Sequence, residues 1–207
     1  MSVQDVLEKI KVWFETGDEN SNDIVEMPWE VEIERDANGG IKMITAINPR
    51  MPVRFHVFPL EKCIRIAVDM GLETAYLKPS SRIKVYRTAL ILNSAVEIMK
   101  FELVGLDDEL WACADLSIQS INEGEFNDTI AALFIGLTTI VVKLGLEEKL
   151  KTSMFTTLIQ MLKERIEKGF KPEDLLNFLT RRAGMDEKLA RQLIMEASGR
   201  QPPIMYR

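Results

Sequence analysis

The chain of 207 residues is 46% hydrophobic and 28% charged, which is ordinary for a soluble globular protein and allows one large domain or one domain with an appendage. Its net charge of −6 disfavours a main domain that binds nucleic acid, because an acidic surface repels phosphate. The two cysteines, Cys63 and Cys113, form no Cys-x-x-Cys pair, which argues against a structural zinc site and for a reduced, cytoplasmic setting. Met1 to Ile10 is polar and lacks the pattern of a secretory signal, so we expect none.

The first part of the chain predicts one helix followed by three strands. Val3 to Glu15 carries apolar residues at spacings of three and four, which is typical of an amphipathic helix. From Trp29 to Glu34 the apolar period becomes two, so we expect a half-buried strand. Asn38-Gly39-Gly40 tolerates positive φ and predicts a hairpin turn into a second strand, Ile41 to Asn48. Val53 to Phe58 alternates again and predicts the third strand.

The middle of the chain predicts a further strand, a helix and a second hairpin. Cys63 to Met70 alternates, which favours a strand, although a short helix from Leu60 remains a competing interpretation. Lys78-Pro79-Ser80-Ser81 predicts the start of a helix with a serine as N-cap. Met99 to Leu106 and Leu110 to Leu116 flank an acidic turn, Asp107-Asp108-Glu109, and predict the hairpin. The helix predicted to start near Ser80 carries four residues that lie three or four apart on one side: Ile83, Tyr86, Leu90 and Asn93.

The longest apolar run, Ile130 to Val142, lies between Asp128 and Lys143. It is shorter than the roughly 20 residues that a membrane helix needs. We therefore expect a buried core helix rather than a membrane anchor. Asn122 precedes this helix, and Leu144-Gly145 provides the glycine expected at its end.

Residues 1–145 thus predict an α+β domain, an antiparallel sheet flanked by helices, and residues 146–207 an all-α extension of about three short helices. The first part has 14 basic and 23 acidic residues, a net charge of −9, whereas the extension has 12 and 9, a net charge of +3. The extension's helices are expected at Glu147 to Lys168, from Pro172 onward, and at Lys188 to Ala197. Gln201 to Arg207 contains two prolines and predicts a frayed end.

An ordered set of motifs points to a known family. The set consists of Arg82 to Arg87, Leu90, Leu92-Asn93, Lys100 to Leu103, Ala112 to Leu116, and Phe126. With it, the chain resembles the YbjN-like domain, a family similar in fold to type III secretion chaperones, over about residues 1–145. The resemblance implies a sheet flanked by helices, frequent dimerisation and a protein-binding or chaperone-like role, with no catalytic machinery.

The polar side chains offer little chemistry. His56 is the single histidine, and no motif places a serine or cysteine nucleophile beside it. The acidic turn Asp107-Asp108-Glu109 lacks the spaced ligands and glycine of a calcium loop. Glu30, Glu32 and Glu34 share one side of a strand and are better explained as a charged edge than as a metal site. We therefore expect no enzyme, no metal and no cofactor.

Trp111 and Cys113 are the candidate partner-binding residues. They share one side of the strand Leu110 to Leu116, opposite its leucines and alanines. If helices cover the leucine side, this pair projects from an open sheet face of the kind that a partner or a second copy requires. The reverse arrangement, with the pair in the core, fits a period of two equally well. Asn93 is a poor residue for a helix interior and predicts hydrogen bonds to neighbouring backbone that fix its helix against the sheet.

The extension supports a second hypothesis. Two helices joined at Ala183-Gly184-Met185 can form a helix-turn-helix. The residues that would then contact DNA are Lys188, Arg191, Gln192 and Arg200. Because the extension has only a small positive excess, we prefer a helical unit that binds protein. The favoured function is a non-enzymatic protein-binding module, chaperone-like or an adaptor. We expect it to act as a homodimer and not to bind a membrane. The alternative is a DNA-binding regulator.

Overall fold

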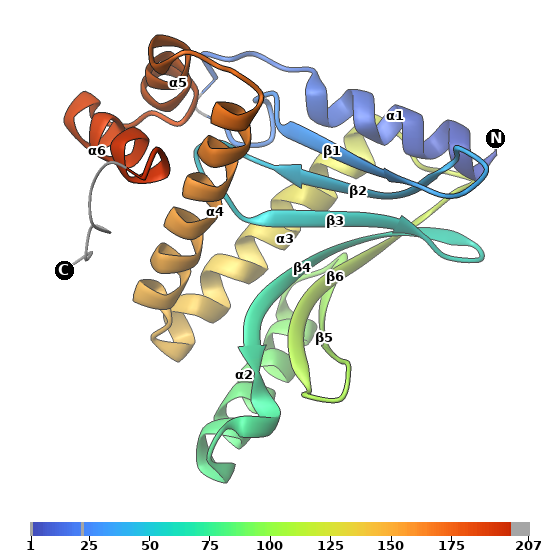
Figure 1. Cartoon of the computed structure of the whole chain (residues 1–207). Helices are drawn as coiled ribbons and strands as arrows, with labels where there is room; N and C mark the ends of the chain where they lie inside the picture. The colour runs from blue at the N-terminus through green and yellow to red at the C-terminus, as the bar shows by residue number, and fades with distance from the viewer. Residues whose placement is uncertain (1, 22, 200–207) are drawn as a thin grey trace.

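The computed structural model describes residues 2–21 and 23–199, and its centre is a six-stranded, wholly antiparallel sheet (Figure 1). The strand order is β1-β2-β3-β4-β6-β5, so β1 and β5 are the two edges. Helices flank this sheet, which confirms the predicted α+β fold. The strands are β1 (Glu30–Arg35), β2 (Ile41–Ile47), β3 (Arg54–Pro59), β4 (Cys63–Glu73), β5 (Met99–Val104) and β6 (Glu109–Ser117).

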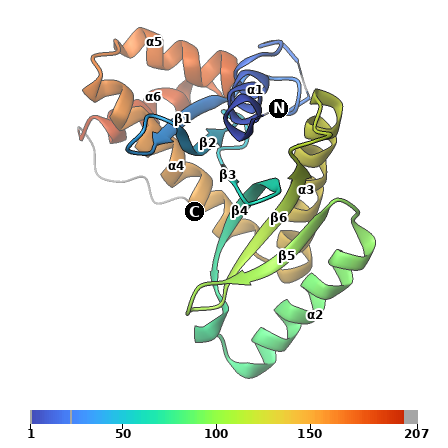
Figure 2. The same ribbon diagram turned by 90° about the vertical axis from the view of Figure 1, so that its right-hand side faces the viewer.

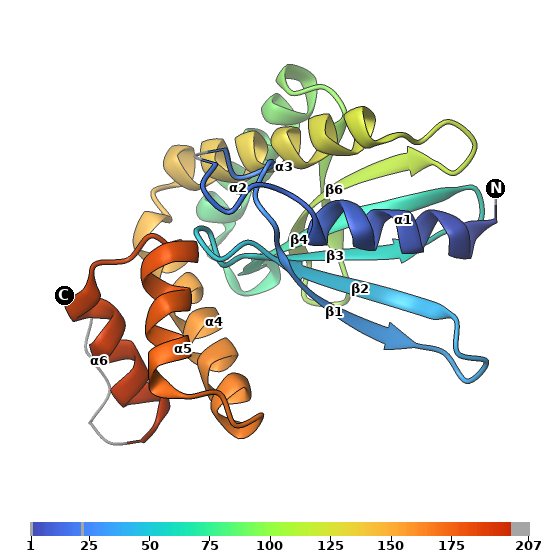
Figure 3. The same ribbon diagram turned by 90° about the horizontal axis from the view of Figure 1, so that it is seen from above.

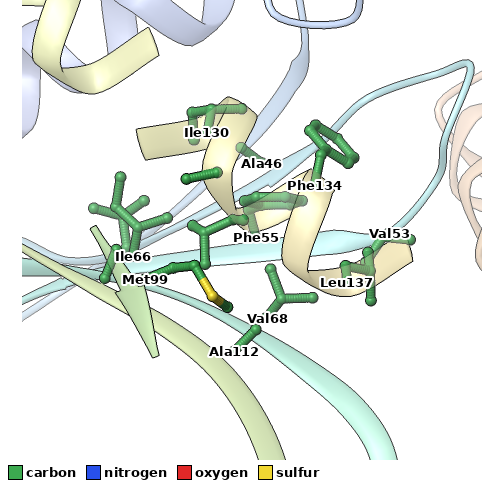
Figure 4. Close-up of a cluster of buried hydrophobic side chains, with 14 of the residues drawn as sticks. Ala46, Val53, Phe55, Ile66, Val68, Met99, Ala112, Ile130, Phe134 and Leu137 are labelled. Carbon is green, nitrogen blue, oxygen red and sulfur yellow. The ribbon is translucent and has the colours of Figure 1, made fainter. Parts of the chain in front are cut away.

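Three helices cover one face of the sheet: α1 (Val3–Glu15), α2 (Pro79–Ala95) and α3 (Glu123–Leu144). Figure 3 shows α1 and α3 lying over the strands from above. The buried side chains of the strands follow their period of two, since alternate residues point at the helices. Figure 4 shows Phe55, Ile66 and Ala112 from the sheet beside Ile130 and Phe134 of α3.

Aromatic rings fill one end of this core. Phe14 of α1 lies edge-on to Phe126 of α3, with 4.8 Å between ring centroids. Phe55 of β3 contacts both Trp29 and Phe134 at centroid separations of 5.0 Å. These rings join the first helix, the sheet and α3 into one core, as the amphipathic pattern of Val3–Glu15 predicts.

The segment Cys63–Glu73 is a strand, so the competing helix from Leu60 is wrong. β4 pairs with β3 on one side and with β6 on the other. Its register shifts between Asp69 and Glu73, where Gly71 takes a positive φ of 58°. A short 3₁₀ turn, η1 (Thr74–Tyr76), then leads into α2.

Helix α2 differs from the sequence prediction at its start. It starts at Pro79 with Lys78 as N-cap, so the predicted serine cap is wrong; proline needs no N–H donor at the first helical position. Of the four residues that share one side of this helix, Ile83 and Leu90 are exposed, whereas Tyr86 and Asn93 are half-buried. Apolar residues occur on more than one side of this helix. The side that packs against the sheet and α3 includes the smaller residues Val85 and Ala89. The buried residues of α2 are Val85, Ala89 and Leu92.

Asn93 forms side-chain hydrogen bonds to backbone that fix α2 against the sheet, as the sequence predicts. Its side-chain Nδ2 donates to the backbone oxygen of Phe101 (3.2 Å), and its Oδ1 accepts from the Phe101 N–H (2.7 Å). Because β5 is an edge strand, this amide covers backbone groups that would otherwise be free to pair with another strand.

Helix α3 confirms the predicted core helix, with Asn122 as N-cap and Gly145 as a left-handed C-cap. By length and composition alone it could cross a membrane, yet half of its most apolar window is buried inside the fold. Its residues Leu133, Leu137 and Ile140 belong to the main core.

The extension is helical, and it packs on the other face of the sheet at the ends of β1 to β3. Ile47 of β2 is buried in its core together with Leu158 and Leu162 of α4. In Figures 1 and 2 the extension and α2 lie at opposite ends of the molecule. Gln201 to Arg207 lies outside the described residues. The predicted helix Glu147 to Lys168 is confirmed to within one residue, although it is not short. The helices of the extension are α4 (Glu147–Glu167), α5 (Pro172–Asn177), its continuation as a π-helical turn η2 (Phe178–Arg182), and α6 (Glu187–Ala197).

Candidate interaction surfaces

Trp111 and Cys113 lie on the sheet face that α1, α2 and α3 leave uncovered. Leu110 and Leu116 of the same strand are in the core beneath the helices, so Trp111 and Cys113 point to the opposite face of the sheet. Trp111 is half-buried and its Nε1 donates to Glu109 (3.2 Å). The Cys113 side chain is only 1% exposed, so its thiol offers no contact surface in this structure.

An ion-pair network surrounds Cys113. Arg65 donates to both carboxylate oxygens of Asp115 (2.7 and 2.8 Å) and to Glu102 (2.8 Å). Lys100 lies 2.9 Å from Glu102 and 3.1 Å from Asp115. The hydrogen bonds from Arg65 lower the pKa of Asp115, and burial raises the pKa of Cys113 to about 12. The thiol is therefore protonated and unreactive at neutral pH.

His56 has structural partners. Its Nδ1 lies 3.3 Å from the Thr45 hydroxyl, and its ring lies 6.0 Å from that of Trp111. Burial, with the nearby charge of Arg54, lowers its pKa, so the ring is neutral at pH 7. Within residues 2–21 and 23–199, no three His, Cys, Asp or Glu side chains lie close enough together to hold a metal ion.

The acidic turn between β5 and β6 is held by aromatic donors. Asp108 takes a positive φ of 50°, which a turn residue of this type tolerates. The three acidic side chains of this turn are half-buried and accept hydrogen bonds. Asp107 accepts from the Tyr76 hydroxyl (2.7 Å), Asp108 from that of Tyr86 (3.4 Å) and Glu109 from Trp111.

The three glutamates of β1 have different environments. Glu34 forms an ion pair with Lys42 on the neighbouring strand. Burial, and then the adjacent carboxyl of Glu164, raise the pKa of Glu32. Glu30 instead accepts from two arginines of the extension. The charged side of β1 is thus partly covered by the extension, which the sequence pattern does not reveal.

Glu30 is the centre of a contact between the extension and the sheet that we name the Glu30 clamp, formed by Glu30, Arg165, Arg182 and Phe178. Glu30 accepts from Arg165 at 2.6 Å and from Arg182 at 2.5 Å. The Arg165 guanidinium lies 4.0 Å from the centroid of the Phe178 ring, and Arg182 also donates to the Pro28 oxygen (2.9 Å). These residues are missed by sequence reasoning because the glutamate lies 135 and 152 positions before its partners.

The outer side of α2 carries an exposed apolar surface. We define the α2 stripe as Ile83, Arg87, Leu90, Ile91 and Ser94, which line one shallow depression along the helix. Ile83 is 66%, Leu90 69% and Ile91 51% exposed. Ile98, at the turn into β5, is exposed as well and takes a positive φ of 73°, which strains a β-branched residue.

Three of the residues proposed to contact DNA lie on α6, beyond a tight turn at Gly184 with a positive φ of 66°. Lys188 and Arg191 are exposed and Gln192 is half-buried, whereas Arg200 lies outside the described residues. Arg191 donates to Glu187 on the same helix (2.6 and 3.0 Å), which reduces the positive charge that α6 presents.

Comparison with known proteins identifies the family of the main domain. A family model described as "Domain of unknown function (DUF8183)" matches residues 9–144, which is more than half of the chain. The chain belongs to the DUF8183 family. The DUF8183 match ends with α3, and a second model, HTH_78, also described as a domain of unknown function, matches residues 145–207. A search of curated proteins finds no match.

Two solved structures are similar to this DUF8183 protein at low identity. One is the heterodimeric ExoU-SpcU complex of the Pseudomonas aeruginosa type III secretion system, with 16% identity over 54% of this chain and 88% of that chain, and a TM-score of 0.42. The other is YbjN from E. coli, with 12% identity, 57% and 84% coverage, and a TM-score of 0.39. These are the two groups that the sequence resemblance names, in agreement with that prediction.

Proposed function

We propose that this DUF8183 protein is a non-enzymatic protein-binding module, chaperone-like or an adaptor, that acts as a homodimer in a reduced, cytoplasmic setting. The α2 stripe is the observation that carries the proposal. A contiguous group of large exposed apolar side chains on a soluble protein often marks an interaction site. Only the Val85 side of α2 is covered here, and three large aliphatic side chains are more than half exposed on the other. Such a surface gains free energy when a protein covers it.

A second copy of the chain fits this stripe by charge. The N-terminal half of α2 is basic, with Lys84 and Arg87 exposed, and the helix contains no acidic residue. Just after its C-terminal end, Glu97 is exposed. In a two-fold dimer with antiparallel α2 helices, each basic half faces the partner's Glu97 and the negative end of its helix dipole. Leu90, near the middle, then packs close to the two-fold axis.

The open sheet face provides a second contact in this proposal. Trp111 lies half-buried above β6, and half-buried aromatic side chains are enriched at protein interfaces. We assign it to client binding, because the stripe is used by the second copy. The buried thiol of Cys113 has no direct role.

Replacing Leu90 with glutamate tests the dimer. Two-fold symmetry places the new charge in the interface twice, so we expect dimer affinity to fall by about 100-fold or more, since burying one such side chain contributes about 1.5–3 kcal/mol. Analytical ultracentrifugation of wild type and Leu90→Glu measures the change. Val12→Glu is the matched control, because Val12 is a half-exposed aliphatic residue on α1, outside the stripe.

The control protein is expected to dimerise as the wild type does, and circular dichroism is expected to show the same helix content in all three proteins. A wild-type chain that sediments as a monomer at all concentrations contradicts the dimer. So does a Leu90→Glu protein that dimerises as tightly as the Val12→Glu control.

A DNA-binding regulator is the second candidate, favoured by one observation: a tight turn at Gly184 joins α5 and η2 to α6, on which Lys188 and Arg191 are exposed. It ranks second because Glu187 pairs with Arg191 and Asp186 caps the same helix. Binding to duplex DNA that weakens steeply with salt and disappears in Arg191→Ala would place it first.

A further inference from the structure

A groove of about 520 Å³ lies between α4 and the uncovered face of the sheet, away from the α2 stripe. Its volume is within the range of small-molecule sites in proteins. Charged and polar side chains contribute part of its lining, notably Arg54 and His56 from β3 and Lys149 from α4. Its apolar lining comes from the sheet and from both helices at the α3–α4 junction: Val53, Met70, Leu137, Val141, Leu146 and Leu150.

Arg54 is the unusual residue of this groove. It is half-buried, and its Nη1 donates to the hydroxyl of Thr157 on α4 (3.2 Å). Over residues 2–21 and 23–199 it forms no ion pair, whereas Arg65 and Arg165, which are also half-buried, each bind a carboxylate directly. A guanidinium has five donors and prefers a carboxylate that accepts two of them. Arg54 therefore retains hydrogen-bonding capacity at the groove.

The charges that line the groove favour an anion. Arg54 and Lys149 are positive and Asp69 is negative. Burial lowers the pKa of His56, so this ring contributes no charge at pH 7. Lys149 donates to the Gly71 oxygen, which holds its ammonium beside the groove.

We propose that this groove binds a small amphipathic carboxylate, with an acyl chain against Leu137, Val141 and Leu150 and the carboxylate on the Arg54 guanidinium. The apolar lining accounts for the chain. Arg54 accounts for the head group, because within the described residues it interacts with Glu32 by charge but forms no ion pair with a carboxylate. The site uses no residue of the α2 stripe, so the proposed ligand site and the proposed dimer can be tested independently.

Calorimetric titration of the full chain with decanoate tests the site, with 1-decanol as the ligand that keeps the chain and lacks the charge. We expect decanoate to bind and Arg54→Gln to weaken it roughly tenfold or more, the effect of losing a charged hydrogen bond. Arg35→Gln is the matched control, because Arg35 lies on β1 and pairs with Glu8 outside the groove. It is expected to leave the affinity unchanged.

A second variant covers the case in which Arg54→Gln disturbs the contact with Thr157. Ser153 is an exposed residue of α4 that lines the groove, so Ser153→Trp fills the space with no cost to the core. We expect it to abolish decanoate binding with the helix content unchanged. The proposal is overturned if decanoate gives no binding, if decanol binds as tightly as decanoate, or if Ser153→Trp binds decanoate like the wild type.

Discussion

Glu30→Ala is expected to lower the free energy of unfolding by about 2–4 kcal/mol and to loosen the extension from the sheet. The substitution leaves Arg165 and Arg182 half-buried without their carboxylate, and an uncompensated charge at such a site is costly. The expected loss is smaller than for a fully buried pair, because all three side chains keep some contact with solvent. Urea unfolding measures the free energy, and hydrogen exchange measures the protection of α4.

Glu34→Ala is the matched control for this experiment. Glu34 lies on the same side of the same strand, but its partner Lys42 is exposed and comes from the sheet itself. The expected loss is under about 1 kcal/mol, with no change in the exchange of α4. Equal losses for the two variants, or unchanged protection of α4 in Glu30→Ala, would show that the Glu30 clamp does not hold the extension.

Phe55→Ala is expected to destabilise the protein by about 3–5 kcal/mol, the usual range for truncation of a buried aromatic ring. Phe55 is fully buried and packs between Trp29 and Phe134, so its removal leaves a cavity where the sheet meets α3. Chemical denaturation followed by circular dichroism measures the loss.

Phe170→Ala provides the comparison on the extension. Phe170 is 45% exposed and its ring contacts the Arg165 guanidinium at 5.4 Å. We expect it to cost under about 1 kcal/mol, because little apolar surface is lost and such exposed cation–π contacts are weak. If Phe55→Ala also cost less than this, the core described for the sheet and α3 would be incorrect.

The elements were predictable from the sequence where one periodicity dominates. Three elements have a clear apolar period or a long apolar run in the sequence, and all three form as predicted. They are the helix Val3–Glu15, the strand Cys63–Glu73 and the helix Glu123–Leu144. Asn93 was predictable for a different reason, since an amide inside a helix needs a partner outside it.

Faces and long-range contacts were not predictable in the same way. The sequence does not show which side of α2 is buried, because Ile83 and Leu90 fit an apolar stripe as well as Val85 and Ala89 do, and packing alone decides between them. The side of β6 that faces solvent was left open by its period of two. The Glu30 clamp depends on tertiary structure, which brings together residues that no local pattern connects.

Photo-crosslinking at position 90 tests the central claim, that the α2 stripe is a protein-contact surface, most directly. A photoreactive residue in place of Leu90 is expected to give a covalent product of twice the chain mass of 23.6 kDa, and the same residue in place of Val12 none. No product from position 90, or equal amounts from both positions, would contradict the account.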